Sequence, residues 1–233
     1  MSLSAFQDAL ARRVLAADPP PDPGSDRLTA AERSCLDRLS AGAGLRVTAK
    51  VQRSWCLERA FDCARTTLSA LPPAARERLV TQWVEAGGGT ASFAASEAAD
   101  FLAFIARALP DPSPELTLCR IEQAVVRAAD AALTFVPPDL AAMKGGDLVL
   151  RTHSAASLVR YAAQPARSAD DEVEALFAPG IADLCRPAEA AEVRLWRGLE
   201  TPTRLEALRR RGHADQTVRQ MLLCGAIEPE PER

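Results

Sequence analysis

Apolar residues in the first part of the chain recur three and four positions apart, which is the spacing of amphipathic helices. Prolines, glycines and a T-x-x-E capping pattern at Thr29 and Glu32 separate the periodic segments. We predict helices over about 3–17, 29–40, 48–70, 73–85, 101–109 and 118–133. The expected core stripe of the third helix is Val51, Trp55, Ala64, Leu68 and Leu71, and that of the sixth is Leu118, Ile121, Val125, Ala129 and Leu133.

The period changes to the alternation of β-strands in the last third of the chain. Strands are predicted at 149–153, 157–163 and 173–178, and HSAA between the first two suits a tight hairpin. Three short helices should follow at 187–199, 201–212 and 213–226, the second of them capped by Thr201 or Thr203. After the last helix, GAI lets the chain return as an extended tail.

These elements predict a mainly α protein with a small α+β domain. The Pro- and Gly-rich segment 134–147 is typical of a linker between domains. We therefore expect an N-terminal helical domain over 1–140 and a winged-helix-like module of three strands and three helices over 147–233. The N–H and C=O groups of an open sheet edge can hydrogen-bond an extended peptide, so the module is a candidate peptide receptor.

Composition and charge restrict the function. The chain has 233 residues, is 48% hydrophobic and carries a net charge of −3, so nothing draws it generally to nucleic acid or anionic lipid. No run approaches the about 18 apolar residues of a membrane span, and the N-terminus lacks the basic-then-apolar order of a secretory signal. We expect a cytoplasmic protein that does not bind membranes.

The sequence contains little that could carry catalysis or hold a metal. Its six cysteines form no C-x-x-C pair, and His153 and His213 are its two histidines, so we expect free thiols and no metal site. With two histidines in the chain, a Ser or Cys nucleophile has few bases with which to pair. The tract GGGT at 87–90 lacks the lysine and the preceding strand of a phosphate loop. We assign no catalytic residue and do not expect an autonomous enzyme.

The pattern LWRGL, TPTRLEAL and TVRQMLLCGAI resembles the three-helix half of the leader-peptide recognition elements of peptide-modification pathways, the PqqD type. That resemblance implies that the leader of a precursor peptide adds as a strand beside the third strand, against the third helix. The edge would be residues 173–178. The implied peptide-binding groove is lined by Leu176, Phe177, Val218, Met221 and Leu222.

The tracts RSWCLERAFDCA (53–64) and LCRIEQAVVRA (118–128) resemble the partner subunits of multinuclear iron peptide oxidases, the MbnC and TglI type of methanobactin and thiaglutamate biosynthesis. The resemblance implies an accessory chain with no cofactor of its own. The iron belongs to a TIM-barrel oxidase to which the chain presents a precursor peptide whose cysteine is modified. The candidate partner interface is Arg53, Glu58, Arg59, Arg120, Glu122 and Gln123. A solvated helix face explains the same residues without a partner.

Two other functions stay open. Three helices beside a small sheet also suit a winged-helix DNA-binding regulator, with Arg209 to Arg211 as phosphate contacts. Against it, the expected recognition helix exposes one cation, Arg219, among four polar side chains, and the chain is acidic overall. Nucleic acid is therefore not the expected partner, and a structural scaffold is the third alternative.

Overall fold

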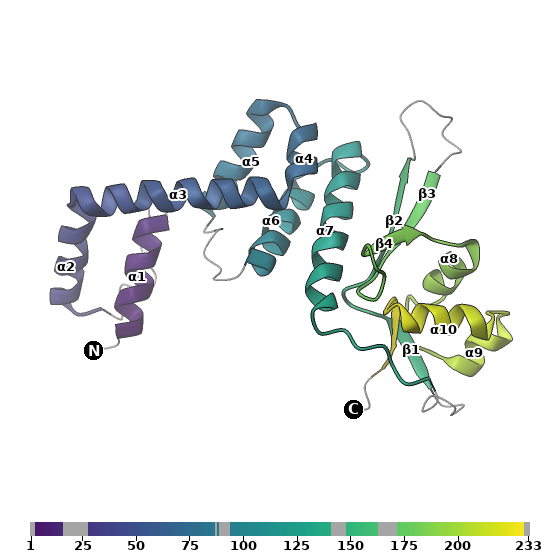
Figure 1. Ribbon diagram of the computed structural model, residues 1–233. Helices are drawn as coiled ribbons and strands as arrows, with labels where there is room; N and C mark the ends of the chain where they lie inside the picture. Colours follow the sequence, from purple (N-terminus) through teal and green to yellow (C-terminus); the bar gives the residue numbers. More distant parts are fainter. Residues whose placement is uncertain are drawn as a thin grey trace. The chain divides into compact units, whose positions relative to one another are not determined.

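The computed structural model describes residues 3–15, 28–86, 88, 94–140, 148–162 and 172–230. These residues form a mainly helical protein with two small antiparallel sheets, which confirms the predicted combination of α and α+β structure (Figure 1). The chain divides into two units, Met1–Asp111 and Pro112–Arg233. Within the described ranges, no helix is both long and apolar enough to cross a membrane.

The N-terminal unit is built from α-helices. They are α1 (Leu3–Leu15), α2 (Ala30–Ala41), α3 (Ala43–Cys63), α4 (Arg65–Ala70), α5 (Pro73–Glu85) and α6 (Ala94–Ala108). The predicted capping box at the start of α2 is present: the Thr29 hydroxyl accepts from the Glu32 N–H at 3.2 Å, and the Glu32 carboxylate accepts from the Thr29 N–H at 2.8 Å. In the core, the rings of Trp83 and Phe101 lie 4.6 Å apart.

The helix expected over 48–70 is two helices. The chain leaves the α conformation at Ala64, whose φ is −127° and ψ is 35°, and this separates α3 from α4. Ala64 and Leu68 are fully buried, as expected, but Val51 and Trp55 are 45% and 57% exposed. The predicted apolar stripe is therefore core at its C-terminal end and surface at its N-terminal end.

Helix α7 (Pro114–Ala132) opens the C-terminal unit. The Ser113 hydroxyl caps it by accepting from the Leu116 N–H at 3.0 Å. The prediction that Val125 and Leu133 face the core is wrong, since they are 37% and 85% exposed. The buried face holds Leu116, Cys119, Ala124 and Ala128. Small residues form this face because α7 packs closely on a sheet, which the spacing of its larger residues does not reveal.

The described residues contain six strands, which form two sheets. They are β1 (Val149–Thr152), β2 (Ser157–Ala162), β3 (Glu172–Phe177), β4 (Cys185–Pro187), β5 (Thr203–Arg204) and β6 (Ile227–Pro229). The orders are β5-β1-β6 and β2-β3-β4, all antiparallel. The predicted hairpin between the first two strands is wrong, because β1 pairs with β5 and β6. The expected extended tail is β6.

Helices α8 (Ala190–Arg197), α9 (Leu205–Arg210) and α10 (Asp215–Leu223) follow in the predicted order. Leu195, Leu208 and Met221, one from each, are fully buried in a core that also holds Leu150 of β1 and Leu176 of β3. The expected threonine cap of α9 is absent. Thr203 lies in β5, and the N-cap residue of α9 is Arg204.

The two units divide at Asp111 and Pro112, earlier than the expected linker at 134–147. Helix α7 belongs with the sheets because Ala124 shares a buried cluster with Val159, Ala175 and Phe177. The first half of the expected linker also packs on this unit, as the ring of Phe135 lies against the backbone of Gly225. Residues 141–147 lie outside the described residues.

Candidate functional site

The five residues expected to line a peptide groove are all buried. Leu176, Val218, Met221 and Leu222 share one core cluster, and each is at most 3% exposed. Phe177 points to the other face of its sheet, where it packs with Ala124 of α7. These side chains stabilise the fold, and an added peptide could reach them only by displacing core packing.

The expectation that residues 173–178 form an open edge is also wrong. Strand β3 is the inner strand of its sheet, between β2 and β4. Strand β4 pairs with Ala175 to Phe177, and the ladder is extended by the Ala188 N–H, which donates to Glu174 O at 2.8 Å. The sequence did not predict β4 because three residues are too few to show alternation.

A groove lies between the start of α8, strand β4 and the end of α10. Its volume is about 430 Å³, and it is lined by Gly180, Arg186, Glu189, Glu192, Gln220, Leu223 and Cys224. Leu223 is 45% exposed although it follows two buried residues, so α10 presents an apolar side chain here. We call this the β4–α10 groove.

Strand β4 has an outer edge beside this groove. The Ala178 N–H donates to Leu184 O and the Ala188 N–H to Glu174 O, which shows which residue pairs of β3 and β4 are hydrogen-bonded. Because hydrogen-bonded pairs alternate in antiparallel sheets, the N–H and C=O of Cys185 point away from β3. Arg186 of the same strand lines the groove, so a strand added at this edge would lie next to it.

An ion pair forms one wall of the β4–α10 groove. The Arg186 guanidinium donates to both carboxylate oxygens of Glu192, at 2.7 Å from Nη1 to Oε2, and the Glu189 N–H donates to Oε2 at 3.0 Å. Burial opposes the charge of Glu192, but these hydrogen bonds outweigh it and lower the pKa of the carboxyl. The hydrogen bonds that Arg186 donates to Glu192 raise the pKa of the guanidinium. The pair joins β4 to α8.

The side chains of the β4–α10 groove suit binding rather than catalysis. Cys224 lines the groove. Burial raises the pKa of its thiol, which keeps the thiol protonated near neutral pH. The Sγ donates to Met221 O at 3.5 Å. Within the described residues, no three His, Cys, Asp or Glu side chains are placed to hold a metal ion.

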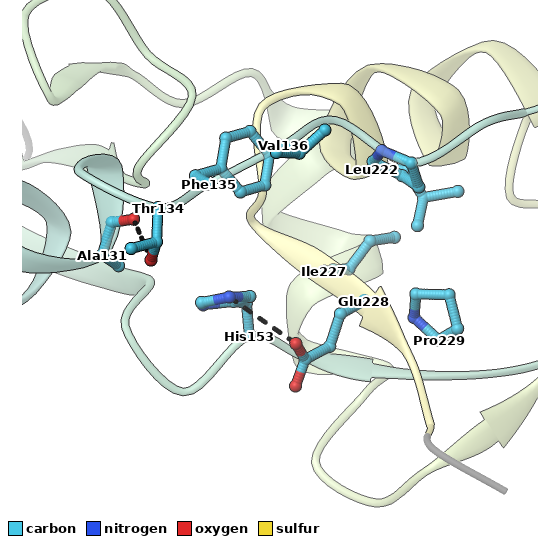
Figure 2. A pocket seen from close by; sticks show the side chains of 10 residues that line it. Ala131, Thr134, Phe135, Val136, His153, Leu222, Ile227, Glu228 and Pro229 are labelled. Carbon is cyan, nitrogen blue, oxygen red and sulfur yellow. Dashed lines mark hydrogen bonds and ion pairs between the residues drawn. The ribbon is translucent and has the colours of Figure 1, made fainter.

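A second groove of about 320 Å³ borders β6 (Figure 2). Phe135, Val136 and Ile227 give it apolar walls, and His153 and Glu228 lie at one end. His153 Nδ1 accepts from the Ala155 N–H at 3.1 Å, so Nε2 carries the proton that faces Glu228 at 3.6 Å. Arg151 already pairs with Glu228 at 2.7 Å, so the charge of this carboxylate is compensated.

The candidate partner-interface residues fall in both units. On α3, Glu58 is exposed and Arg59 pairs with Glu97 at 3.1 Å, while the side chain of Arg53 lies outside the described residues. On α7, Arg120 is exposed, and Glu122 and Gln123 are half-buried. The first three residues thus belong to the N-terminal unit and the last three to the C-terminal unit, and their role at a partner interface stays a prediction.

Two charged residues that sequence reasoning missed are nearly fully buried. Glu97 of α6 and Glu192 of α8 are each 2% exposed, and an arginine pairs with each. A signal was present for Glu192, because Glu189 and Glu192 have the spacing of a capping box. Glu97 stands among alanines in AASEAAD, where nothing in the sequence names its partner.

Comparison with known proteins adds no identification. The chain matches no protein-family model and is not significantly similar to any curated protein with which it was compared.

Proposed function

We propose that the chain is a non-catalytic accessory subunit in the biosynthesis of a ribosomally made peptide natural product. It binds the leader of the precursor by strand addition and presents the precursor to an iron-dependent TIM-barrel oxidase that modifies a cysteine. The resemblance of LWRGL, TPTRLEAL and TVRQMLLCGAI to leader-recognition elements, and of CRIEQ to oxidase partner subunits, supports this function. The C-terminal unit is then a winged-helix-like recognition module, and the protein acts in the cytoplasm.

The observation that carries the proposal is the β4–α10 groove beside an outer strand. It keeps the third helix of the module as one wall, as the resemblance implies, but moves the acceptor edge from β3 to β4. Cys185 offers one main-chain donor and one acceptor, and Leu223 offers an apolar contact. These contacts alone are few, so we expect side chains of the leader to enter the groove as well.

Leu223→Glu tests the groove. A carboxylate there would lose water when the leader binds, so we expect affinity to fall about tenfold or more. The probe is a fluorescently labelled precursor peptide with its leader, titrated against the full chain. Gln216→Glu, an exposed position near the start of α10 that does not line the groove, is the matched control. Unchanged affinity of a folded Leu223→Glu variant would refute the groove.

The winged-helix DNA-binding alternative enters the same experiment. A labelled DNA duplex replaces the peptide, and Arg209, Arg210 and Arg211 are neutralised together. DNA binding would be lost in that variant and would fall steeply with salt. Arg209 already pairs with Asp215, at 2.8 and 3.0 Å, which leaves less of the cluster for phosphate.

A further inference from the structure

Helix α3 exposes an apolar stripe on the side that faces away from the core of its unit. Val47, Val51 and Trp55 are 61%, 45% and 57% exposed. Their spacing of four residues places them along one face of the helix. Leu45 and Ala49, on the other side, are half-buried. We call Val47, Val51 and Trp55 the α3 stripe.

Charges beside the α3 stripe separate by sign along the helix. Arg46 and Lys50 are exposed in the N-terminal half, and Glu58 and Asp62 are exposed in the C-terminal half. Arg59 is also exposed in the C-terminal half, but the buried carboxylate of Glu97 lies 3.1 Å from its guanidinium and compensates its charge. Asp62 also pairs with Arg65 at 2.8 Å, an exposed contact that contributes little and can be exchanged. Among the described side chains, cations therefore lie beside the N-terminal end of the α3 stripe, and Glu58 and Asp62 lie beside its C-terminal end, where Glu97 compensates Arg59.

We propose that the α3 stripe binds the α3 stripe of a second copy of this chain, with the two helices antiparallel. In that arrangement the apolar residues of the two copies face each other. The basic half of each helix lies beside the acidic half of the other, so Lys50 meets Glu58 twice. Such a twofold interface is self-complementary. Trp55 supplies the large apolar contact, and the charges set the orientation.

The charge pattern favours this occupant over others. An anionic lipid surface or a partner of one charge sign would attract one half of α3 and repel the other. An antiparallel copy satisfies both halves with the same contacts. Ser54, small and exposed, lies between Lys50 and Glu58 and allows the two helices to approach closely. The inference is independent of the proposed function, because it concerns α3 and not the β4–α10 groove.

Sedimentation of the full chain between low and high micromolar concentration measures the dimer. We expect a reversible monomer–dimer equilibrium that Trp55→Ala weakens about tenfold or more. Arg78→Glu, a charge reversal at an exposed position on α5 of the same unit, should leave it unchanged. Circular dichroism verifies that each variant is folded. A chain that stays monomeric throughout overturns the proposal, as would a shift of tryptophan fluorescence on anionic vesicles that occurs without dimerisation and that Trp55→Ala abolishes.

A charge exchange tests the antiparallel orientation. Lys50→Glu and Glu58→Lys should each weaken self-association, because each places like charges opposite each other twice. In an equimolar mixture of the two variants, each position 50 again meets an opposite charge at position 58 of the other chain. A heterodimer should therefore form. The double variant in one chain should also dimerise again. Dimers that persist in both single variants, or a mixture that does not associate, would overturn the α3 interface.

Discussion

At the scale of single residues, burial decides which side chains stabilise the fold and which can bind. Met221 and Leu223 are two positions apart on α10, yet Met221 is fully buried and Leu223 is 45% exposed. A charge at Met221 would sit unpaired in the core and unfold the unit, so that substitution cannot report on peptide binding. A charge at Leu223 leaves the core intact and acts on the groove.

The ion pair of Arg186 and Glu192 should make stability depend on pH. The pKa of Glu192 is lower in the folded than in the unfolded chain. The pair therefore stabilises the fold above the ordinary carboxyl pKa of about 4.3, and this stabilisation is lost as pH falls through the folded-state pKa. Breaking a fully buried ion pair costs more, but Arg186 is 35% exposed and water can still solvate it when its partner is lost. We therefore expect Glu192→Gln to lower the free energy of unfolding by about 2 kcal/mol near neutral pH.

Urea unfolding at neutral and acidic pH measures this effect. The difference between wild type and Glu192→Gln should shrink in acid, because both chains then lack the charge. Glu200→Gln, at an exposed position after α8, is the control and should cost almost nothing at either pH. Parallel pH profiles of wild type and Glu192→Gln would contradict a stabilising role for the pair.

At the scale of elements, close packing of loops and helix ends holds the C-terminal unit together. A Cβ at Gly225 would lie 2.6 Å from the ring of Phe135 and 2.9 Å from Pro179, and Gly225 has a φ of +70°. Gly212, which ends the segment after α9, has a similar φ of +84° but open space around it. The two glycines share a backbone conformation and differ in packing.

This pair allows strain and packing to be separated. Gly212→Ala should cost about 1 kcal/mol, the strain of a left-handed conformation. Gly225→Ala should cost about 3 kcal/mol, because the ring of Phe135 must also move. In the double variant with Phe135→Ala, the cost of Gly225→Ala should fall toward that of Gly212→Ala. Chemical denaturation measures these three variants and Phe135→Ala alone, and equal costs for the two glycines would show that the contact with Phe135 is unimportant.

At the scale of the whole molecule, α7 belongs to the C-terminal unit. Its Ala124 closes the face of the sheet that carries Val159, Ala175 and Phe177. Without α7 that face would be open to water, which costs free energy in proportion to the apolar area exposed. The unit that can fold alone should therefore begin before α7 and not after it.

Two fragments test this division. A fragment of residues 112–233 should unfold cooperatively, whereas a fragment of residues 147–233, which begins at the boundary expected from sequence, should be poorly folded or aggregate. Thermal unfolding followed by near-ultraviolet circular dichroism, with the full chain as reference, compares them. Equal stability of the two fragments would mean that α7 contributes nothing to the unit.

Much of the secondary structure could be predicted because it depends on neighbouring residues. The Thr29 and Glu32 capping box, the proline at the start of α5 and the alternation in β2 are local signals, and the structure has the elements that they predict. The burial of Val218, Met221 and Leu222 also follows from helical spacing. Sequence alone thus determined the order of the longer helices and of β1 to β3, and the combination of α and α+β structure.

Only the tertiary structure decided how the strands pair and which apolar faces are buried. The N–H and C=O groups of a strand can pair with any other strand, so the local sequence does not predict which strands pair. It therefore did not predict that β1 pairs with β5 and β6, or that the short β4 pairs with β3. Periodicity located apolar residues on α3 and α7 but not the side that packs, because burial depends on elements distant in the chain. For that reason Val51, Trp55 and Leu133 lie at the surface, and the candidate groove moved from β3 to β4 and α10.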